Sequence, residues 1–249
     1  MPLAIAFRIE AFDTLASTQG EVRARLERGE DVDGLVVRAG VQTQGRGRRG
    51  RSWTSATGGS YQTLAVRDPE PPLLGRGGSA VAVAVGLAET FGTYGLRLGI
   101  KWPNDLVYRG RKLGGILTEY LRGHLLVGVG VNVANEPPEG ATSLRGWDPE
   151  GVSGAVLAGI QHGLDSWLED AEALPARFRP FDVLAERAVS IDAGGRRVSG
   201  IARGIDGDGC LLLAPSEAQR DGAGGNGAVA VCSGRVVRGR AVNPKWITL

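Results

Sequence analysis

The sequence predicts an α+β fold in which a larger domain of strands and helices is followed by a small β-barrel. Two observations support this prediction. Residues 1–184 mix short apolar runs, which are typical of strands, with longer amphipathic stretches, which are typical of helices. Residues 185–249 contain only short β-like runs that are separated by Gly/Asp turns. A chain of 249 residues is long enough for one large domain and a second, much smaller one.

The elements of the larger domain follow from hydrophobic periodicity and from capping residues. Ser17 and Thr18 offer N-cap chemistry for the first helix. The Ala-rich run at residues 79–94 is predicted as a helix because it is too long for a strand. We predict strands at residues 5–12, 35–37, 61–66, 98–102, 106–108, 112–120 and 125–133. We predict helices at residues 21–27, 79–94, 152–167 and 174–184, with a break at Pro180 and a rigid Pro-rich segment at residues 69–72.

The smaller domain is predicted from its turns. Its strands are expected at residues 188–191, 197–204, 210–213 and 229–231, with a flexible Gly-rich loop at residues 221–227. In the larger domain, the strand at residues 125–133 is expected at an exposed sheet edge. A second copy of the chain could pair with such an edge, so a homodimer is possible.

Composition and targeting signals limit the function. Hydrophobic residues make up 42% and charged residues 22% of the chain, as in an ordinary soluble globular protein. The net charge of +2 provides no global basic field that would recruit nucleic acid. The N-terminus carries no basic-then-apolar signal, and no apolar run approaches the roughly 18 residues of a transmembrane helix. We therefore expect a cytoplasmic protein that does not enter a membrane.

Cysteine and histidine are expected to play no part in the chemistry. Cys210 and Cys232 show no CxxC or metal-ligand spacing, so both are predicted to be buried, reduced thiols. His124 and His162 lie outside every motif and are predicted at the surface. The chain contains no GxSxG, HExxH or GxxxxGK(S/T) motif and no evident metal site. Catalysis should therefore rely on electrostatic stabilisation by Arg and Lys.

The stretch from Val41 to Trp53 is the most informative part of the sequence. Its central residues, 45–51, are four arginines and three glycines. The arginines repel one another, and each glycine raises the entropic cost of ordering the backbone. Arginine side chains and free backbone N–H groups bind phosphate and carboxylate. We therefore predict a loop that closes over a phosphorylated or adenylylated ligand.

Two other interpretations of this loop stay open. It matches the dinucleotide fingerprint GxGxxG, but that motif runs into a helix, and residues 51–59 do not look helical. It could also be a solvated charge run, such as an Arg/Gly segment that binds RNA.

Three further segments place polar groups beside strand ends or glycines. In the KWPND segment at residues 101–105, Pro103 stops a strand and leaves Asn104 and Asp105 at its end, where open α/β sheets place ligand groups. The RKLGGIL segment at residues 111–117 begins an apolar strand with adjacent glycines. In GVGVNV, residues 128–133, the alternate glycines leave room either for a flat ligand or for tight packing.

Taken together and in this order, the segments resemble the biotin–protein ligase family. The family is marked by Ser-Thr-Asn near the N-terminus, Q-x-x-GRGRRGR-x-W, KWPND, RKLxGIL and G-x-G-x-N, and by a terminal barrel with a GIxxxGxL-type hairpin. The matching segments here are residues 17–19, 42–53, 101–105, 111–117, 128–132, 141–144 and 203–212. The resemblance covers essentially the whole chain. It implies a mixed β-sheet flanked by helices, of the class II synthetase-like type, followed by an SH3-like barrel.

The resemblance also implies a two-step reaction. The carboxylate of biotin attacks the α-phosphate of ATP, which carries Mg²⁺, and gives biotinyl-5′-AMP and pyrophosphate. A lysine of a biotin carboxyl carrier protein, the biotinyl domain of a carboxylase, then takes up the biotinyl group. Only sixteen residues precede Ser17, too few for the winged-helix domain of repressor relatives, so we expect the monofunctional form without specific DNA binding. The alternatives are a lipoate–protein ligase of the same fold and an RNA-binding protein that uses the Arg/Gly loop.

The resemblance assigns roles to individual residues. The implied biotin-binding residues are Ser17, Thr18, Gln19, Gln42, Arg46, Gly47, Arg48, Lys112 and Gly115. The implied ATP- or adenylate-binding residues are Arg46, Arg48, Trp53, Lys101, Asn104, Lys112 and Asn132. Lys112 and Arg48 are the expected catalytic residues, because they would offset the charges of the carboxylate and the α-phosphate. Gln19 departs from the family pattern, which has Asn there. Mg²⁺ should arrive with ATP, and no set of protein ligands for it is evident in the sequence.

Overall fold

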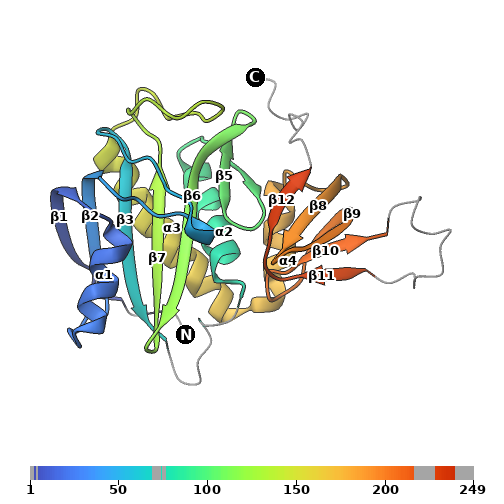
Figure 1. Ribbon diagram of the computed structural model, residues 1–249, viewed down its shortest axis with the longest axis horizontal. Helices are drawn as coiled ribbons and strands as arrows, with labels where there is room; N and C mark the ends of the chain where they lie inside the picture. Colours follow the sequence, from blue (N-terminus) through green and yellow to red (C-terminus); the bar gives the residue numbers. More distant parts are fainter. Residues whose placement is uncertain (1–2, 4, 69–73, 75–76, 216–227, 239–249) are drawn as a thin grey trace.

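The computed structural model describes residues 3, 5–68, 74, 77–215 and 228–238. Its larger part is a seven-stranded mixed sheet with the order β1-β2-β3-β7-β6-β5-β4 (Figure 1). β1 and β2 run parallel, and all other neighbouring strands run antiparallel. The strands are β1 Arg8–Leu15, β2 Leu35–Gln42, β3 Ser60–Arg67, β4 Gly99–Lys101, β5 Asp105–Tyr108, β6 Arg111–Leu121 and β7 His124–Val131. The predicted mixed sheet is thus confirmed.

Helices cover both faces of this sheet. α1 (Thr18–Glu27) packs on one face, and α2 (Ser79–Thr93) and α3 (Pro149–Glu169) lie together on the other, behind the sheet in Figure 1. The faces are separated by the alternation of side chains along a strand. Leu64 of β3 is buried in the core with α2 and α3, whereas its neighbour Ala65 is buried with α1. In the described ranges, no helix combines the length and the apolar character needed to cross a membrane.

The C-terminal part is a five-stranded antiparallel sheet with the order β11-β10-β9-β8-β12, consistent with the predicted small barrel (Figure 1). Its strands are β8 Ala188–Ala193, β9 Arg196–Ile205, β10 Leu211–Ala214, β11 Val229–Val231 and β12 Arg235–Arg238. β12 was not predicted from the sequence. The short helix α4 (Leu174–Phe178) and the 3-10 turn η3 (Arg179–Phe181) precede this sheet. The domain boundary after residue 184 stays a prediction.

The boundaries of the predicted elements differ modestly from those observed. Ser17 Oγ accepts a hydrogen bond from the Gly20 N–H at 3.2 Å, so the predicted N-cap is confirmed, although the helix begins at Thr18 rather than at residue 21. The helix predicted at residues 174–184 is interrupted where Pro180 was expected to break it, and it ends at Phe181. The predicted break at residues 69–72 and the loop at residues 221–227 lie outside the described residues.

The prediction that residues 125–133 form an exposed edge strand is wrong. These residues belong to β7, which pairs with β3 on one side and with β6 on the other. The strands at the two edges of this sheet are β1 and β4. A second copy of the chain therefore has no free hydrogen-bonding edge at β7. The pattern of apolar residues and glycines is the same for a central strand as for an edge strand, so it does not distinguish the two positions.

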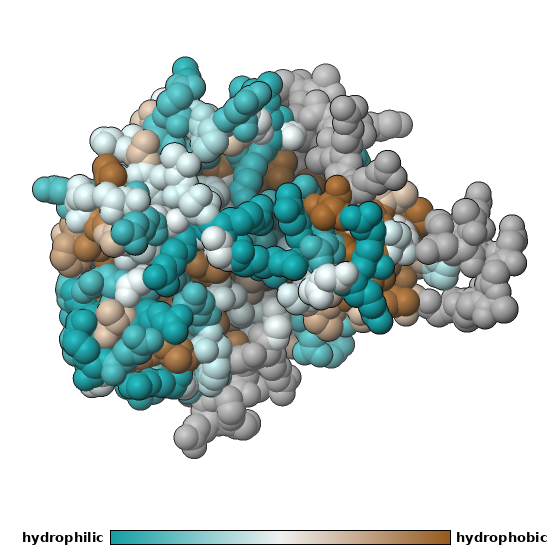
Figure 2. Space-filling model, in the orientation of Figure 1, coloured by the Kyte–Doolittle hydropathy of each residue, from teal (hydrophilic) through white to brown (hydrophobic). Residues whose placement is uncertain are grey.

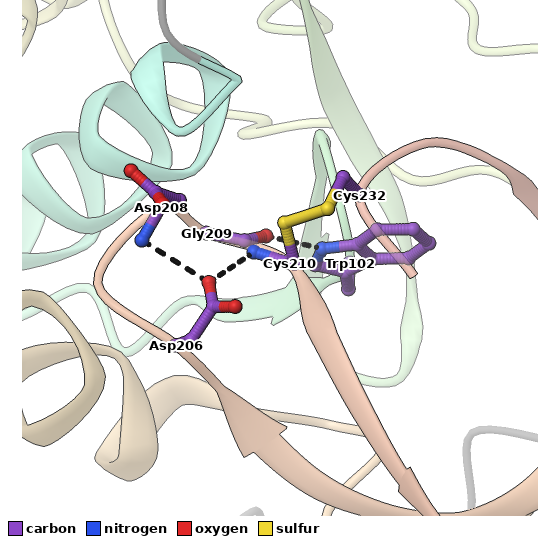
Figure 3. The surroundings of a disulfide bond; sticks show 6 residues. All are labelled: Trp102, Asp206, Asp208, Gly209, Cys210 and Cys232. Carbon is purple, nitrogen blue, oxygen red and sulfur yellow. Dashed lines mark hydrogen bonds between the residues drawn. A yellow bond between two sulfur atoms is a disulfide. The ribbon is translucent and has the colours of Figure 1, made fainter. Parts of the chain in front are cut away.

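Two predictions about individual side chains are also wrong. Cys210 and Cys232 form a disulfide rather than two reduced thiols (Figure 3). They flank β10 and β11, and the antiparallel pairing of these strands brings them together. His124 is only 6% exposed, because it begins the central strand β7. His162, in contrast, is exposed on α3 as predicted, and its Nε2 lies 2.8 Å from Glu89 Oε2.

The two parts of the molecule meet at the turn before β10. The indole N–H of Trp102, from the KWPND segment, donates to the Gly209 carbonyl at 2.9 Å (Figure 3). The indole N–H of Trp167 donates to the Gly207 carbonyl at 3.2 Å. Within the turn, Asp206 Oδ1 accepts the Cys210 N–H at 2.8 Å. Trp102 of the KWPND segment is therefore a structural anchor for the C-terminal sheet. That sheet adjoins the strands that carry the polar end of the same segment.

Candidate active site

A cavity lies on the face of the sheet that carries α1, at the N-terminal end of this helix. It is bordered by the first turn of α1, the end of β2, the Arg/Gly loop and the strands β3, β6 and β7. All the predicted site residues except Lys101 and Asn132 line it. The lining residues are Ser17, Thr18, Gln19, Gln42, Arg46, Gly47, Arg48, Arg51, Ser52, Trp53, Gln62, Thr63, Asn104, Lys112, Gly115, Ile116, Leu117, Gly128, Val129 and Gly130.

One end of the cavity is a set of hydrogen-bonded side chains, all of them buried except the half-buried Gln42. Thr63 Oγ1 lies 2.9 Å from Thr18 Oγ1 and 3.2 Å from Gln19 Oε1. Gln42 Oε1 accepts the Thr18 N–H at 2.8 Å and the Thr18 hydroxyl at 3.2 Å, and Gln42 Nε2 donates to Ser55 Oγ at 2.7 Å. Gln19 Nε2 is buried without a partner among the described residues. An unpaired buried amide is costly, so this end is suited to a polar ligand group.

The Arg/Gly loop forms a short hairpin. The Trp53 N–H donates to the Gly45 carbonyl at 2.8 Å, and a Cβ on Gly45 would lie 2.8 Å from Ser55 Oγ. At the tip, the 3-10 turn η1 (Arg48–Gly50) places Arg49 at φ +58°. The loop crosses the front of the sheet in Figure 1, and hydrophilic side chains extend across the middle of this face in Figure 2. Backbone hydrogen bonds therefore define a conformation for a loop whose charges oppose order.

The loop tip also contacts the C-terminal sheet. Arg49 Nη1 donates to the Asp192 carbonyl at 3.0 Å, and Arg49 Nη2 lies 3.6 Å from Asp192 Oδ2. Asp192 belongs to β8, so one arginine of the loop is used for docking rather than for the cavity. Arg49 could not be singled out from the sequence, because its partner lies 143 positions away.

Lys112 lies at the mouth of the cavity between a carboxylate and an aromatic ring. Its Nζ is 2.5 Å from Asp105 Oδ1 and 5.2 Å from the centre of the Trp53 ring. The side chain of Lys112 is 34% exposed and that of Asp105 is 26% exposed, so solvent screens the pair only in part. An anionic ligand would compete with Asp105 for the ammonium group.

Arg48 is the most buried cation of the loop. Burial lowers its pKa, and the neighbouring charges of Arg49 and Arg51 lower it further, whereas Asp105 raises it. Its Nη1 donates to Asn104 Oδ1 at 3.1 Å, and Asn104 is itself held to β6 by its Nδ2, which donates to the Ile116 carbonyl at 2.8 Å. Since burial opposes the charge of Arg48, a bound anion would offset this cost.

The glycines of the central strands make room for side chains. Gly115 of β6 and Gly130 of β7 are directly paired across the sheet. A Cβ on Gly130 would lie 2.7 Å from Trp53 Nε1, and a Cβ on Gly128 would lie 2.6 Å from Gln19 Oε1. Trp53 Nε1 is buried without a partner among the described residues. A flat ligand that lies on Gly130 would therefore have to displace the Trp53 ring.

Two predicted site residues lie apart from this cavity. Asn132 is 1% exposed, its Nδ2 donates to the Thr142 carbonyl at 3.2 Å, and its Oδ1 accepts from Asn135 at 3.1 Å. It borders an adjoining cavity that also reaches Lys112. The Asn132 amide thus holds the segment that follows β7 in place. A contact with a ligand would be a second role beside this structural one. Lys101 is not among the described residues that line either cavity.

The polar residues of β3 were not predicted from the sequence as site residues. Thr63 is fully buried and belongs to the polar end of the cavity. Gln62 borders the cavity, but its side chain is bonded to the opposite side, where its Nε2 donates to the Ser153 carbonyl at 2.9 Å. The available signal was two consecutive polar residues inside an otherwise apolar strand, since buried polar groups need partners.

The arrangement combines three chemical environments in one cavity. The polar end offers donors and acceptors to a compact polar ring, and the middle is lined by apolar residues of β6 and β7. The mouth presents the cations Arg46, Arg48 and Lys112. Such a site can hold a ligand with a polar head, an apolar body and an anionic end, and can bring a second anion beside that end.

Comparisons with known proteins give a family, relatives and a similar fold for this chain. Residues 12–134 match the Biotin/lipoate A/B protein ligase family. The chain is 34% identical over 211 residues to the biotin–[acetyl-CoA-carboxylase] ligase of Mycobacterium tuberculosis, with 79% of each chain covered. It is 30% identical over 203 residues to the bifunctional ligase/repressor of Escherichia coli, and the match spans 74% of this chain and 63% of that protein. The fold is similar to that of the biotin protein ligase from Aquifex aeolicus in complex with biotin and ATP, with a TM-score of 0.75, 26% identity, and coverage of 92% of this chain and 97% of that one.

Proposed function

The chain belongs to the biotin/lipoate A/B protein ligase family, and we propose that it activates biotin with ATP and attaches it to a lysine of a carrier protein. One observation carries this proposal. A cavity with a buried polar end and a cationic mouth lies in a chain that is 34% identical, over 79% of its length, to a biotin–[acetyl-CoA-carboxylase] ligase. The similar Aquifex aeolicus structure holds biotin and ATP, which supports the assignment of both substrates to this enzyme.

In the first step, a carboxylate oxygen of biotin attacks the α-phosphorus of ATP. The new P–O bond gives biotinyl-5′-AMP, and the bond to the bridging oxygen breaks so that pyrophosphate leaves with the Mg²⁺ that entered with ATP. Two anions must approach each other, and each pair of like charges at ~4 Å repels by about 4 kcal/mol at an effective dielectric constant near 20. Arg48 and Lys112, both at the cavity mouth, are the catalytic residues that offset this repulsion.

In the second step, the amine of a carrier lysine attacks the carbonyl carbon of the anhydride. The amide bond forms, AMP leaves, and the amine loses a proton. The same cations stabilise the phosphate that departs. The Arg/Gly loop, which crosses the cavity, would keep water away from the anhydride until the carrier arrives.

The biotin ring occupies the polar end of the cavity in this proposal. Ser17, Thr18, Gln19 and Gln42 bind the ureido group, and Gly115 lets the bicyclic ring approach the sheet. The support is the burial of Ser17, Thr18 and Gln19, the hydrogen-bond capacity of all four side chains, and the Gln19 amide, one end of which has no partner among the described residues. Because Trp53 lies on the neighbouring Gly130, its ring moves outward when biotin binds.

The nucleotide occupies the mouth and the adjoining cavity. Arg46, Gly47 and Asn104 contact the phosphates together with the catalytic cations, and the displaced Trp53 ring covers the adenine. Asn132 borders the adjoining cavity and supports the segment that closes it. Lys101 lines neither of these two cavities, so it contacts only the part of the triphosphate that extends beyond them.

The acceptor is proposed to be the biotinyl domain of a carboxylase. This assignment rests on the named substrate of the Mycobacterium tuberculosis relative.

The function can be tested by exchange of labelled pyrophosphate into ATP. The purified protein should catalyse this exchange when biotin is present and not when biotin is omitted. Exchange that depends on lipoate instead of biotin would assign the chain to lipoate ligation. A carrier domain should then become biotinylated, and a carrier in which arginine replaces the acceptor lysine should not.

A further inference from the structure

Thr63 is a buried polar residue to which the proposed reaction assigns no role. Its side chain is fully buried in the central strand β3 and borders the cavity between two residues assigned to biotin. Its hydroxyl contacts both Thr18 and Gln19. The inference below rests on the proposed function, since it concerns how the cavity recognises the ring of biotin.

The donors and acceptors of this polar end determine the direction of its hydrogen bonds. The backbone N–H of Thr18 can only donate, so the Gln42 atom 2.8 Å away is the oxygen, and the Gln42 amide nitrogen donates to Ser55. The second lone pair of that oxygen accepts the Thr18 hydroxyl at 3.2 Å. Thr18 has then used its single proton, and it accepts the proton of Thr63 at 2.9 Å. Thr63 is left with lone pairs alone for its contact with Gln19.

This order favours one orientation of the Gln19 amide. A half-turn about χ3 exchanges the amide oxygen and nitrogen without moving the rest of the side chain. The nitrogen then stands at the 3.2 Å contact and donates to Thr63, so it is no longer a buried N–H group without a partner. A buried carbonyl that lacks a partner costs less than a buried N–H group that lacks one. The oxygen of Gln19 then takes the other position of the amide, which has no partner among the described residues.

We propose that Thr63 is a positioning residue, whose hydroxyl holds the Gln19 amide so that its oxygen accepts an N–H of the biotin ureido ring. Gln19 itself borders the cavity, and its amide lies against Gly128, where there is no side chain to exclude it. The ureido ring has two N–H groups, and Thr63 makes Gln19 an acceptor for one of them. The hydroxyl of Thr63 thus contributes to specificity through its hold on Gln19.

The test compares Thr63→Val with Thr63→Ser. Valine has the shape of threonine and lacks the hydroxyl, so it leaves the Gln19 nitrogen without an acceptor and Thr18 without a donor. The Kd for biotin, measured by calorimetry, should rise about 5- to 50-fold in Thr63→Val. Serine keeps the hydroxyl, so Thr63→Ser should stay within threefold of the wild type. The KM for ATP should change less than twofold in both variants. If Thr63→Val does not fold, Thr63→Cys provides a second variant without the hydroxyl.

Two further readouts separate positioning from a merely structural effect. Biotin analogues that carry a methyl group on either ureido nitrogen should be discriminated by the wild type, and Thr63→Val should lose most of that discrimination for one of them. In the Gln19→Ala background, Thr63→Val should add less than a twofold change in Kd, because the residues act as a unit. An equal loss in both backgrounds, or a wild-type Kd for biotin in Thr63→Val, would overturn the role of Thr63. Failure of the wild type to bind biotin would instead overturn the proposed function.

Discussion

Lys112 provides the most direct test of how the cavity stabilises charge. Its ammonium group lies at the mouth, 2.5 Å from Asp105, and no other lysine lines this cavity among the described residues. If Lys112 contacts the biotin carboxylate and the α-phosphate, its charge matters most when the two anions are closest. Replacement of Lys112 by alanine should therefore slow formation of the adenylate much more than it weakens the binding of biotin.

The expected magnitude follows from the exposure of this group. A unit charge ~4 Å from an anion contributes about 4 kcal/mol at an effective dielectric constant near 20. Solvent reaches about a third of the Lys112 side chain, and Arg48 remains in the variant, so the loss should lie below that limit. We expect about 2–4 kcal/mol on the barrier, which corresponds to roughly a 30- to 1,000-fold slower first step.

The assay is single-turnover formation of biotinyl-5′-AMP with enzyme in excess, together with the Kd for biotin. The matched control is Arg111→Ala, which removes the same charge from the adjacent position of β6 but lies outside this cavity. Arg111→Ala should leave the adenylation rate within twofold of the wild type. A rate within threefold of the wild type in Lys112→Ala, at saturating substrates, would remove Lys112 from the reacting centre.

Three further predictions concern residues around the site and in the C-terminal sheet. Burial raises the pKa of Asp182 to about 6 from 3.8, so between these pH values the folded state binds more protons than the unfolded state. The free energy of unfolding should therefore fall by at most about 3 kcal/mol as pH rises from 4 to 6, and urea titrations should show that Asp182→Asn lacks this pH dependence. Arg49→Ala removes both contacts of the loop tip with Asp192, so trypsin should cut the remaining loop arginines several-fold faster than in the wild type. Asp192→Ala keeps the backbone carbonyl and should have a smaller effect. Equal cleavage rates in the wild type and both variants would contradict the docking of the loop tip. The disulfide between Cys210 and Cys232 closes a loop with a sequence separation of 22, so Cys210→Ser should lower the free energy of unfolding by about 3 kcal/mol, and dithiothreitol should weaken the wild type but not the variant.

The sequence predicted local elements well where one pattern has one structural meaning. The helix of residues 79–94 and the strand of residues 61–66 were found within a residue or two, because length and periodicity decide both. The N-cap at Ser17 was found because its chemistry is local. Strand order has no such local signal. Residues 125–133 show the same pattern at the centre of a sheet as at its edge, and the edge was the wrong choice.

Long-range pairs account for what the sequence did not predict. Cys210 and Cys232 are brought together only by the pairing of β10 with β11. Arg49 is one of four arginines in its segment, and only its contact with the C-terminal sheet distinguishes it. Thr63 lies in a strand assigned to the core, and its importance depends on α1 placing Thr18 and Gln19 against it. In each of these cases, the residue type was visible and its partner was not.

The positive charge of the site is divided between the sheet and the loop, and we propose that this division determines which part responds to ATP. On the sheet, Asp105 already offsets the charge of Lys112. On the loop, Arg46, Arg48 and Arg51 line the cavity and form no ion pair among the described residues. A triphosphate therefore gains most from the loop arginines, and charge-assisted hydrogen bonds to them offset the entropic cost of ordering a glycine-rich backbone. Lys112 gains a contact with a ligand only when an anion displaces Asp105 from its ammonium group. The biotin carboxylate and the α-phosphate can displace Asp105 when they approach each other. We therefore propose that the loop supplies binding of the nucleotide, whereas Lys112 contributes mainly where the two anions meet.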